Sequence, residues 1–321
     1  MKNILVTSAG RRVELVQEFQ TVLKSFDLPH SVFCADLMPK LSAACLVADK
    51  YFQVPSASDK QYPSALLDIC LDHNIGLIVP TIDTELQVLS DNRERFKHHG
   101  VEVLISAPQL IRACRDKRLT TEIYEKIGIS YPRLYDKNYL RFPLFCKPYD
   151  GSCSIGVKTI YSETDLTPEI LANDKNMYME LVGSEYIEYT CDAYFNLDSE
   201  LCCLVPRERL EVRAGEVSKG ITRKGYVYEH LLKRIGKLEG AIGCITFQVF
   251  GNPSTGEIRA LEINPRFGGG YPLTSASGAT FVEWIVREFL MDQRVTFYES
   301  WKNNLCMLRY DAKVLTVLGE S

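Results

Sequence analysis

The sequence predicts an α/β protein that begins with a parallel sheet covered by helices. In its first third, apolar runs typical of strands alternate with segments in which apolar residues recur every three or four positions. The strand-like runs are residues 3–8, 31–35, 51–54, 75–79 and 101–105, and the helical patterns are 13–26, 64–74 and 83–97. Such alternation indicates parallel strands joined by helical crossovers. We therefore expect a Rossmann-like domain over residues 1–108.

A second observation is the strand pattern within residues 256–270, which ends in a proline, an arginine and three glycines. Side chains alternate between the two faces of a strand, so Leu261 and Ile263 should share one face. The expected opposite face carries Ile258, Ala260, Glu262 and Asn264. Arg266 follows the strand, where a guanidinium can hold an anion through two parallel hydrogen bonds.

The preceding segment, residues 244–250, alternates in the same way and is joined to this strand by the turn-rich stretch 251–256. The two strands should form an antiparallel hairpin that places Gln248 beside Glu262 and Asn264. Three oxygen ligands on one rigid face suit Mg²⁺, which prefers hard oxygen donors. An ordinary hairpin with a solvated polar face fits the same spacing.

Length and composition limit the classes of function. The 321 residues suggest two or three domains, and a net charge of −4 without a basic segment gives no sign of a nucleic-acid surface. No run reaches the ~20 apolar residues of a membrane span, and the N-terminus is too weakly apolar for a signal peptide. The 11 cysteines include no Cys-x-x-Cys pair, which indicates reduced thiols and a cytoplasmic protein. Cys153, in a glycine-containing loop with no histidine nearby in the sequence, is interpreted as a bystander.

Several polar residues follow the predicted N-terminal strands. Gly10 stands alone where a dinucleotide fingerprint needs three glycines, so NAD binding is not favoured. Asp36, at a strand end, fits a ribose-binding acid or a turn residue. Asp83 and Glu85 fit a helix cap, and they also fit a cleft at the carboxyl ends of the strands, where open α/β sheets bind ligands.

The middle of the chain contains two candidate phosphate-binding lysines. Lys117 lies in the first turn of a helix predicted over 116–127, where a positive charge is unfavourable for the helix dipole. Lys147 ends a strand over 143–148. The loop 150–157 follows, rich in small residues that let backbone N–H groups approach phosphate oxygens. A plain hairpin turn explains this loop equally well.

A cationic stretch and three acids complete the candidates. The cations are Arg207, Arg209, Arg213, Lys219, Arg223 and Lys224. They fit either a solvated hairpin face or an anion pocket, for which we select Arg209 and Lys219. The acids Glu180, Glu185 and Glu188 lie on or between strands predicted at 177–181 and 186–195.

The order of these features resembles the ATP-grasp superfamily, and in particular one half of the carbamoyl-phosphate synthase large subunit. The resemblance covers about residues 1–290 and is most specific in the Gln…Glu-x-Asn-x-Arg hairpin. It implies that the N-terminal (pre-ATP-grasp) domain is followed by a two-lobed ATP-grasp α+β domain. The expected parts are a small lobe with a glycine-rich lid over 109–176, a large lobe with the metal site over 177–300, and a tail over 301–321.

The resemblance also implies roles for individual residues. Lys117 and Lys147 would contact the ATP phosphates, and Arg266 would hold the acyl phosphate, with Lys147 and Arg266 acting in catalysis. Lid and hinge residues implied to bind ATP are Gly151, Ser152, Ser154, Gly156, Glu180, Leu181 and Val182. Glu188 fits the ribose ligand, with Glu185 as the competitor.

The resemblance implies a magnesium site, in which Mn²⁺ is also acceptable. Its ligands would be Gln248, Glu262 and Asn264. Many relatives have an acid where Gln248 stands, and this departure leaves open whether one or two metal ions bind.

The predicted activity is an ATP- and Mg²⁺-dependent carboxylate–amine ligase that works through an acyl phosphate. Carboxyphosphate chemistry on bicarbonate and a non-catalytic ATP-binding module are the alternatives. A single such unit without a glutaminase or biotin partner domain argues against a complete carbamoyl-phosphate synthase or biotin carboxylase. The expected partners are a small carboxylic acid and an amine, whose identities the sequence does not give. The oligomeric state stays open, a homodimer being the commonest assembly.

Overall fold

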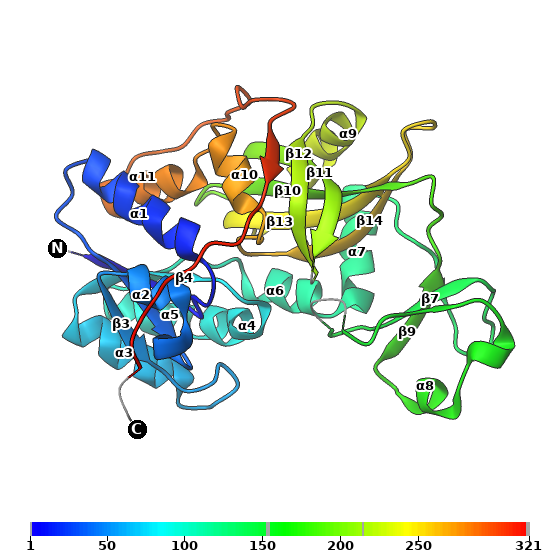
Figure 1. The fold of residues 1–321 in the computed structure, drawn as a ribbon, viewed down its shortest axis with the longest axis horizontal. Coiled ribbons are helices and arrows are strands. Elements are labelled where there is room, and N and C mark those ends of the chain that lie inside the picture. Colours follow the sequence, from blue (N-terminus) through cyan, green and yellow to red (C-terminus); the bar gives the residue numbers. More distant parts are fainter. Residues whose placement is uncertain (1, 152–154, 214, 319–321) are drawn as a thin grey trace.

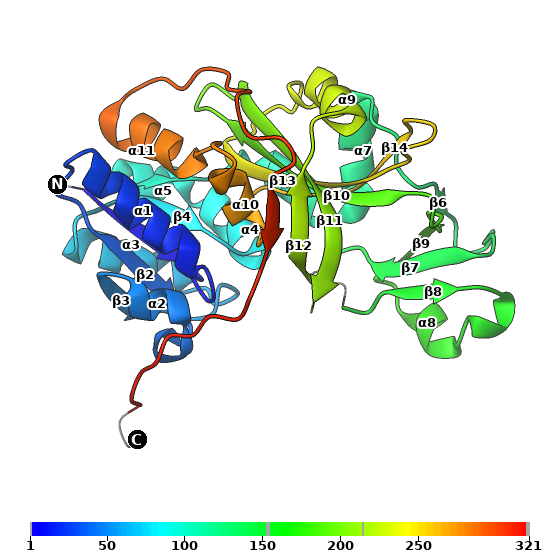
Figure 2. The same cartoon turned by 45° about the horizontal axis from the view of Figure 1, so that its top comes forward.

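The computed structural model describes residues 2–151, 155–213 and 215–318, which form three sheets (Figures 1 and 2). The N-terminal sheet is parallel throughout, in the order β3-β2-β1-β4-β5. Its strands are β1 (Asn3–Thr7), β2 (Val32–Asp36), β3 (Lys50–Gln53), β4 (Ile75–Pro80) and β5 (Glu102–Val103). Its helices are α1 (Val13–Ser25), η1 (Pro39–Leu41), α2 (Ala43–Val47), α3 (Tyr62–Asp72), α4 (Asp83–Asp91) and α5 (Arg93–His98). The predicted Rossmann-like arrangement is confirmed.

The strand order of this sheet creates a switch point between β1 and β4. The chain runs from β1 outward through β2 and β3, then returns to the other side of β1 with β4 and β5. The loops that leave β1 and β4 therefore diverge to opposite sides. Open α/β sheets bind ligands in the crevice at such a point.

The helix predicted over 83–97 is instead two helices, α4 and α5, separated at Asn92. The Asn92 side chain donates a hydrogen bond to the carbonyl of Val88 at 2.8 Å, while its backbone leaves helical geometry at φ −101° and ψ 6°. Asparagine commonly competes in this way with backbone hydrogen bonds. The amphipathic spacing continues across the break, which is why the sequence suggested one helix.

Two helices connect the N-terminal sheet to the rest of the chain. These are α6 (Pro108–Arg115) and α7 (Lys117–Ile127). Asp116 caps α7 by accepting a hydrogen bond from the backbone N–H of Arg118 at 3.0 Å, and Gly128 ends it at φ 73°, which favours glycine. Both helices contact β14 (Ile258–Asn264), an edge strand of the large antiparallel sheet, so they hold Lys117 beside that sheet.

The second sheet belongs to a small lobe that projects away from the other two sheets, at the right of Figure 1. Its strands, in the order β6-β9-β7-β8, are β6 (Leu134–Tyr135), β7 (Leu144–Pro148), β8 (Lys158–Ile160) and β9 (Asn176–Glu180). It also carries η2 (Glu163–Asp165) and α8 (Pro168–Ala172). Leu144, Cys146, Ile160, Ile170 and Tyr178 form its separate small core. The predicted boundary at residue 177 falls within β9.

The third sheet is antiparallel and forms the large lobe, in the order β14-β13-β10-β11-β12-β15. Its strands are β10 (Ile187–Phe195), β11 (Leu201–Arg213), β12 (Glu216–Thr222), β13 (Gly243–Gly251), β14 (Ile258–Asn264) and β15 (Cys306–Leu308). Its helices are α9 (Tyr226–Ile235), α10 (Tyr271–Ala276) and α11 (Phe281–Met291). β15, within the segment expected to be a tail, pairs with the edge of β12.

One continuous apolar core joins the large lobe to one face of the N-terminal sheet, since α11 packs against α1. A second cluster, which includes Leu5 and Ile78, fills the other face. The N-terminal domain and the large lobe therefore share one hydrophobic core and pack as a single unit. The small lobe has little apolar contact with that unit. This division leaves the space between the lobes for a ligand.

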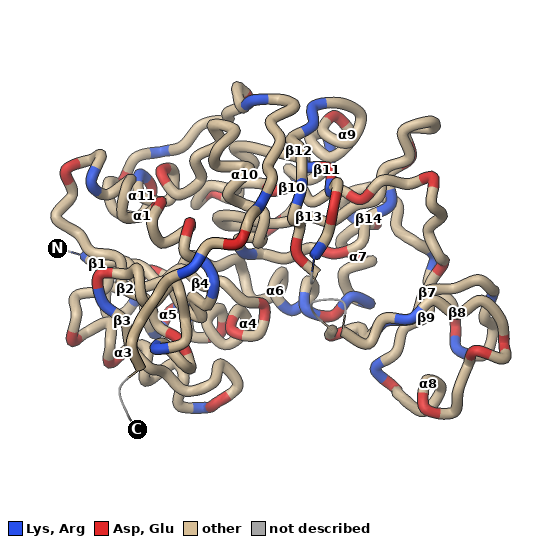
Figure 3. Tube along the Cα trace, viewed as in Figure 1, with Lys and Arg blue, Asp and Glu red and all other residues tan. Residues whose placement is uncertain are grey.

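No helix within the described ranges is long and apolar enough to cross a membrane. Basic and acidic residues are interleaved along the described parts of the chain (Figure 3). Nine of the ten cysteines in the described ranges are buried, in agreement with the predicted buried thiols, and only Cys306 of this group is exposed. Cys153 lies outside the described residues.

Candidate functional site

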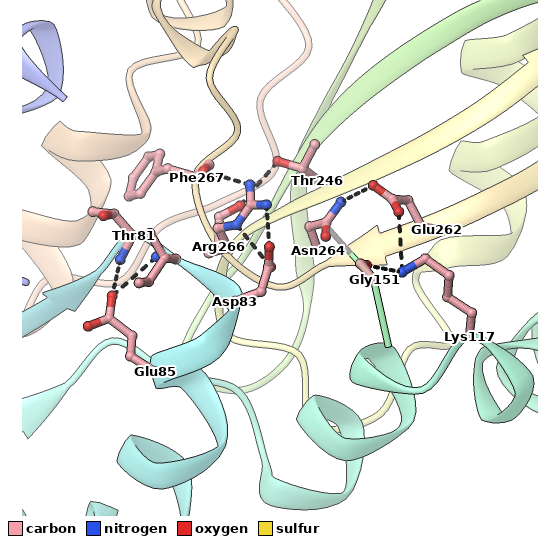
Figure 4. Close-up of polar contacts among 11 residues, drawn as sticks. Thr81, Asp83, Glu85, Lys117, Gly151, Thr246, Glu262, Asn264, Arg266 and Phe267 are labelled. Atoms are coloured by element: carbon pink, nitrogen blue, oxygen red, sulfur yellow. Dashed lines mark hydrogen bonds and ion pairs between the residues drawn. The ribbon is translucent and has the colours of Figure 1, made fainter. Parts of the chain in front are cut away.

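A cleft with a volume of about 770 Å³ lies where the three sheets meet. Residues from the N-terminal loops, from both strands of the small-lobe hairpin and from β10 to β14 line it. Most of the site residues predicted from the sequence face this cleft. Figure 4 shows some of them, including Lys117, Glu262 and Arg266, with the residues that they contact.

The β13–β14 hairpin places the predicted metal ligands together. Gln248 pairs directly with Glu262 across the two strands, and both line the cleft with Asn264. The register shifts after Gln248, so that Val249 pairs with Ala260. This bulge leaves one residue of β14, Leu261, without a partner.

Because of the bulge, the prediction of which β14 residues share a face was partly wrong. Ile258 and Ala260 are buried with Ile263 in the core, whereas Leu261 turns to the cleft with Glu262. Strict alternation fails because a bulge sets two residues of one strand against one of the other. The bulge places two consecutive residues, Leu261 and Glu262, on the ligand side.

Lys117 lies next to this carboxylate. Its Nζ is 3.8 Å from Glu262 Oε2 and donates a hydrogen bond to the carbonyl of Gly151 at 2.6 Å, while Asn264 Nδ2 donates to Glu262 Oε1 at 2.9 Å (Figure 4). The backbone N–H of Lys117 donates to the Tyr149 carbonyl at 3.0 Å. The start of α7 is thereby tied to the loop that follows β7.

Lys147 projects from β7 into the same cleft and is itself buried, with 8% of its surface exposed. Burial lowers the pKa of its ammonium group to about 8, with Lys117 also lowering it and Glu262 opposing the shift. A buried lysine without a hydrogen-bonded partner is costly in free energy. Its position is explained if an anionic ligand completes the cleft.

Glu188 and Arg209 form an ion pair on the wall made by β10 and β11. Burial raises the pKa of Glu188, and the charge of Arg209 opposes that rise. Both residues line the cleft, whereas Glu185 is exposed and does not. The structure therefore places Glu188 and not Glu185 in the cleft, and the ribose-binding role of Glu188 stays a prediction.

The hinge between the lobes supplies a mostly apolar wall. Leu181 and Val182 line the cleft with Glu180, as do several apolar side chains of the small lobe. The Glu180 carboxylate accepts hydrogen bonds from the backbone N–H of Arg133 at 3.2 Å and from Arg259 at 3.1 Å. These bonds fix the end of β9. Apolar walls with a few polar groups are typical of small-molecule binding sites.

Arg266 reaches from the end of β14 to the N-terminal domain. Its Nε and Nη2 donate to the two oxygens of Asp83 at 3.0 and 2.7 Å, and its Nη1 donates to the Phe267 carbonyl at 3.1 Å (Figure 4). Glu85 instead caps α4, accepting from the backbone N–H of Thr81 at 2.7 Å. The alternative left open by the sequence is thus decided: Glu85 is the cap and Asp83 reaches the cleft.

Some predicted ligands are not brought into the cleft. Lys219 is half exposed and pairs with Glu211 at 2.7 Å, away from the lining residues. Gly151 lines the cleft and Gly156 does not, although Gly156 has the positive φ of 76° expected of a loop glycine. Ser152 and Ser154 lie outside the described residues.

Two arginines that line the cleft, Arg12 and Arg207, were not selected as site residues from the sequence. Arg12 ends the loop after β1, and Arg207 lies on β11 with its guanidinium 2% exposed. In the sequence Arg207 was one of six neighbouring cations, three of which are exposed in the structure. A signal for Arg12 was available, because it follows a strand and a lone glycine in the position where switch-point loops bind ligands.

The donor set fits Mg²⁺ with restrictions. No group of three His, Cys, Asp or Glu side chains able to hold a metal exists among the described residues. One carboxylate, Glu262, and the amide oxygens of Gln248 and Asn264 are available. Mg²⁺ is commonly bound by one or two carboxylates plus substrate phosphates and water. The residues therefore fit a metal ion that arrives with a nucleotide.

Comparisons with known proteins agree with this architecture. Residues 4–104 match the family model described as PylC-like, N-terminal domain. A comparison with curated protein sequences gives no match.

Solved structures match almost the whole chain at low sequence identity. The biotin carboxylase domain dimer of the Hydrogenobacter thermophilus 2-oxoglutarate carboxylase has a TM-score of 0.76 and 13% identity, over 95% of this chain and 73% of that one. Biotin carboxylase from Campylobacter jejuni gives 0.74 and 16%, over 95% and 74%. N5-carboxyaminoimidazole ribonucleotide synthetase from Thermotoga maritima gives 0.66 and 22%, over 93% and 78%.

These matched proteins are ATP-grasp enzymes, and this chain shares their fold, including the expected two-lobed domain. The finer resemblance to half of a carbamoyl-phosphate synthase subunit stays a prediction. The chain has the ATP-grasp fold, and its residues 4–104 are similar to the PylC-like N-terminal domain.

Proposed function

We propose that this protein is an ATP- and Mg²⁺-dependent ligase that joins a carboxylic acid to an amine through an acyl phosphate. One observation carries the proposal: two lysines, a carboxylate flanked by two amides, and an arginine line a single cleft between lobes. Phosphoryl transfer needs positive charge around the transferred group more than it needs a nucleophile on the enzyme. The cleft supplies that charge.

The first step would be attack of a substrate carboxylate oxygen on the γ-phosphorus of ATP, with ADP leaving. Lys147 and Lys117 would hold the phosphate oxygens, because each is confined near Glu262. Mg²⁺, bound by Glu262 with Gln248 and Asn264, would neutralise charge on the phosphates. Glu262 is the single carboxylate of this ligand set, which favours one metal ion over two.

The second step would be attack of the amine on the acyl carbon, with phosphate leaving. Arg266 would bind the acyl phosphate and stabilise the oxyanion of the tetrahedral intermediate. Its Asp83 partner holds the guanidinium fork in a fixed orientation at 2.7 Å. An anion arriving at this fork would share or displace that carboxylate.

Bicarbonate is a second candidate for the carboxylate. The Hydrogenobacter thermophilus structure was determined with MgADP and bicarbonate, and its fold is shared by this chain. The first step would then give carboxyphosphate. The remaining alternative is a non-catalytic ATP-binding module. The complete set of cleft residues argues against it.

A screen of ADP release against pools of small acids and amines separates these activities. The ligase predicts ADP release that needs one acid and one amine. Bicarbonate chemistry predicts release that follows bicarbonate and persists without other acids. Tight MgATP binding with no release in any pool would establish the non-catalytic module and contradict the proposal.

Lys147 leads to a prediction on pH. Its lowered pKa, about 8, means that the free protein loses this charge as the pH rises through that value. ATP phosphates prefer the protonated ammonium, so MgATP affinity should fall above about pH 8 in the wild type. Lys147→Ala should weaken binding at pH 7 by about 10- to 100-fold, equivalent to ~1.5–3 kcal/mol for a charged hydrogen bond.

Calorimetric titration of MgATP between pH 6.5 and about 9.5 tests this prediction. Lys158→Ala is the matched control, since Lys158 lies exposed on the neighbouring strand β8. The control should keep both the affinity and its fall with pH. An unchanged pH profile in Lys147→Ala would remove Lys147 from the phosphate site.

We further propose a homodimer located in the cytoplasm. The dimer is supported by the Hydrogenobacter thermophilus domain dimer of the same fold. The ten unpaired cysteines of the described ranges suit a reducing compartment. Light scattering at micromolar concentration tests the assembly, and a monomer at all concentrations would contradict it.

A further inference from the structure

The end of the cleft nearest the N-terminal domain is built differently from the nucleotide end. It lies at the switch point of the parallel sheet, where the loop after β1 carries Arg12 and the loop after β4 carries Thr81 to Asp83. The glycines that follow Arg266, Gly268 to Gly270, form its opposite wall. This is the end that a second substrate would occupy if ATP lies between the lobes.

Most of the charged groups at this end have partners within the protein. Arg266 binds Asp83, and Glu216 is 3.2 Å from Arg309 and 3.3 Å from Arg11. Arg309 directly follows β15, which pairs with β12, and its Nη2 donates a hydrogen bond to the carbonyl of Gly269 at 2.5 Å. These pairs leave no oxygen of Asp83 without a donor.

Arg12 differs from its neighbours. Within the described residues its guanidinium makes no hydrogen bond or ion pair, although it is partly buried and lines the cleft. Burial lowers its pKa, and the nearby charge of Arg266 lowers it further, while Glu216 and Asp83 oppose the shift. A partly buried cation without a partner costs free energy unless a ligand supplies the missing anion.

Arg207 adds a second cation with unused donors. Its Nη2 binds both oxygens of Asp192 at 2.8 and 2.9 Å, and Asp192 also accepts from the hydroxyls of Thr246 and Thr274. Its Nε is buried without a partner among the described residues. A methyl group at Gly270 would overlap this guanidinium, so glycine is required for the close approach.

The balance of charge at this end is positive. Among the residues that line this end, the three arginines Arg12, Arg207 and Arg266 outnumber the carboxylates of Asp83 and Glu216. A simple monocarboxylate held at Arg266 would leave Arg12 unpaired. Arg12 and Arg266 line the same cleft of about 770 Å³, so one small molecule can contact both.

We propose that the acid substrate carries a second anionic group, a carboxylate or a phosphate, which Arg12 binds while the reacting carboxylate lies at Arg266. Arg207 contributes charge to the same end. The proposal rests on the ligase function above and narrows its substrate class.

The test varies only the acid. Hydroxylamine, a small amine without an anionic group, attacks acyl phosphates and gives hydroxamates, which are measured colorimetrically with MgATP present. Matched acids are compared: succinate with butyrate, glutarate with valerate, and 3-phosphoglycerate with glycerate. The dianionic member of at least one pair should react with kcat/KM at least tenfold higher, and the pairs separate carboxylate from phosphate as the second group.

Arg12→Met is the diagnostic variant, with Arg11→Met as its control. Arg11 is the adjacent residue, has the same charge, and is 81% exposed. Arg12→Met should remove the preference for the dianion, by about tenfold or more, and leave MgATP affinity unchanged. Arg11→Met should keep the preference. Arg207→Met is avoided because an uncompensated buried Asp192 would destabilise the fold.

The outcomes separate this proposal from the ligase function. If hydroxamate forms equally well from both members of every pair, or if Arg12→Met keeps the preference, the second anionic group is ruled out while the ligase stands. The amine is then varied, with glycine compared with methylamine. If Arg12 is needed only for a preference for glycine, and not for a preference for the dianionic acid, the second anionic group belongs to the amine and its assignment to the acid is overturned.

A binding measurement covers the case in which no acid reacts. Calorimetric titration of the same six acids in the presence of MgADP should show tighter binding of the dianions to the wild type and to Arg11→Met than to Arg12→Met. That result supports the proposal even where turnover fails. Equal binding within each pair in the wild type would overturn it.

Discussion

Glu262→Gln should abolish turnover without unfolding the protein. The substitution keeps the shape and the hydrogen bond from Asn264 but removes the charge that faces Lys117 at 3.8 Å. Gln248 and Asn264 are neutral, so neither replaces that charge at the metal. We expect a loss of at least a hundredfold in kcat, since charge stabilisation by a metal is worth several kcal/mol.

A magnesium titration identifies the cause of this loss. Raising Mg²⁺ should restore part of the activity of Glu262→Gln by mass action, whereas raising ATP alone should not. Glu257→Gln is the control on the same hairpin, because Glu257 binds Arg259 and Tyr186 outside the cleft. Its turnover should be that of the wild type. Full activity of a folded Glu262→Gln at limiting Mg²⁺ would contradict the metal site.

Arg266→Met should lower kcat by about 10²- to 10³-fold, the usual effect of removing a donor that stabilises a developing oxyanion. MgATP affinity should change little, because the guanidinium lies beside Asp83 at the N-terminal end of the cleft. The measurement is ADP release at saturating substrates, with the melting temperature as the folding control.

Two further variants isolate the role of Arg266. Arg294→Met removes an arginine that is 65% exposed and should leave kcat unchanged. Arg266→Lys keeps the charge but loses the two-pronged fork, so it should recover only part of the rate. Full recovery by lysine would show that charge alone is required. An unchanged kcat in Arg266→Met would exclude Arg266 from the reaction.

Periodic patterns predicted the architecture well because burial determines them. Strand–helix alternation gave the parallel N-terminal sheet, and the turn-rich segment before Glu257 gave the β13–β14 hairpin with Gln248 opposite Glu262. The helix α10 (Tyr271–Ala276) was not predicted. Its short sequence begins after three glycines and includes a proline in its first turn.

The errors arose where tertiary contacts decide the conformation. The bulge after Gln248 places Leu261 on the ligand side of β14. No residue type in that strand indicates a bulge. Arg12 and Asp83 reach the cleft only because the large lobe packs on the switch point of the N-terminal sheet. A single sequence places them at strand ends but cannot say what faces those ends.

Oxygen tracing of the released phosphate tests the central claim most directly. The reaction is run in H₂¹⁸O with MgATP, unlabelled organic acids and the amine that supports ADP release, with the phosphate analysed by mass spectrometry. Attack by a carboxylate oxygen predicts phosphate without ¹⁸O and ADP formed in proportion to the acid consumed. One ¹⁸O in each phosphate, formed whether or not acid is present, would show that water attacks ATP and would contradict the acyl-phosphate ligase.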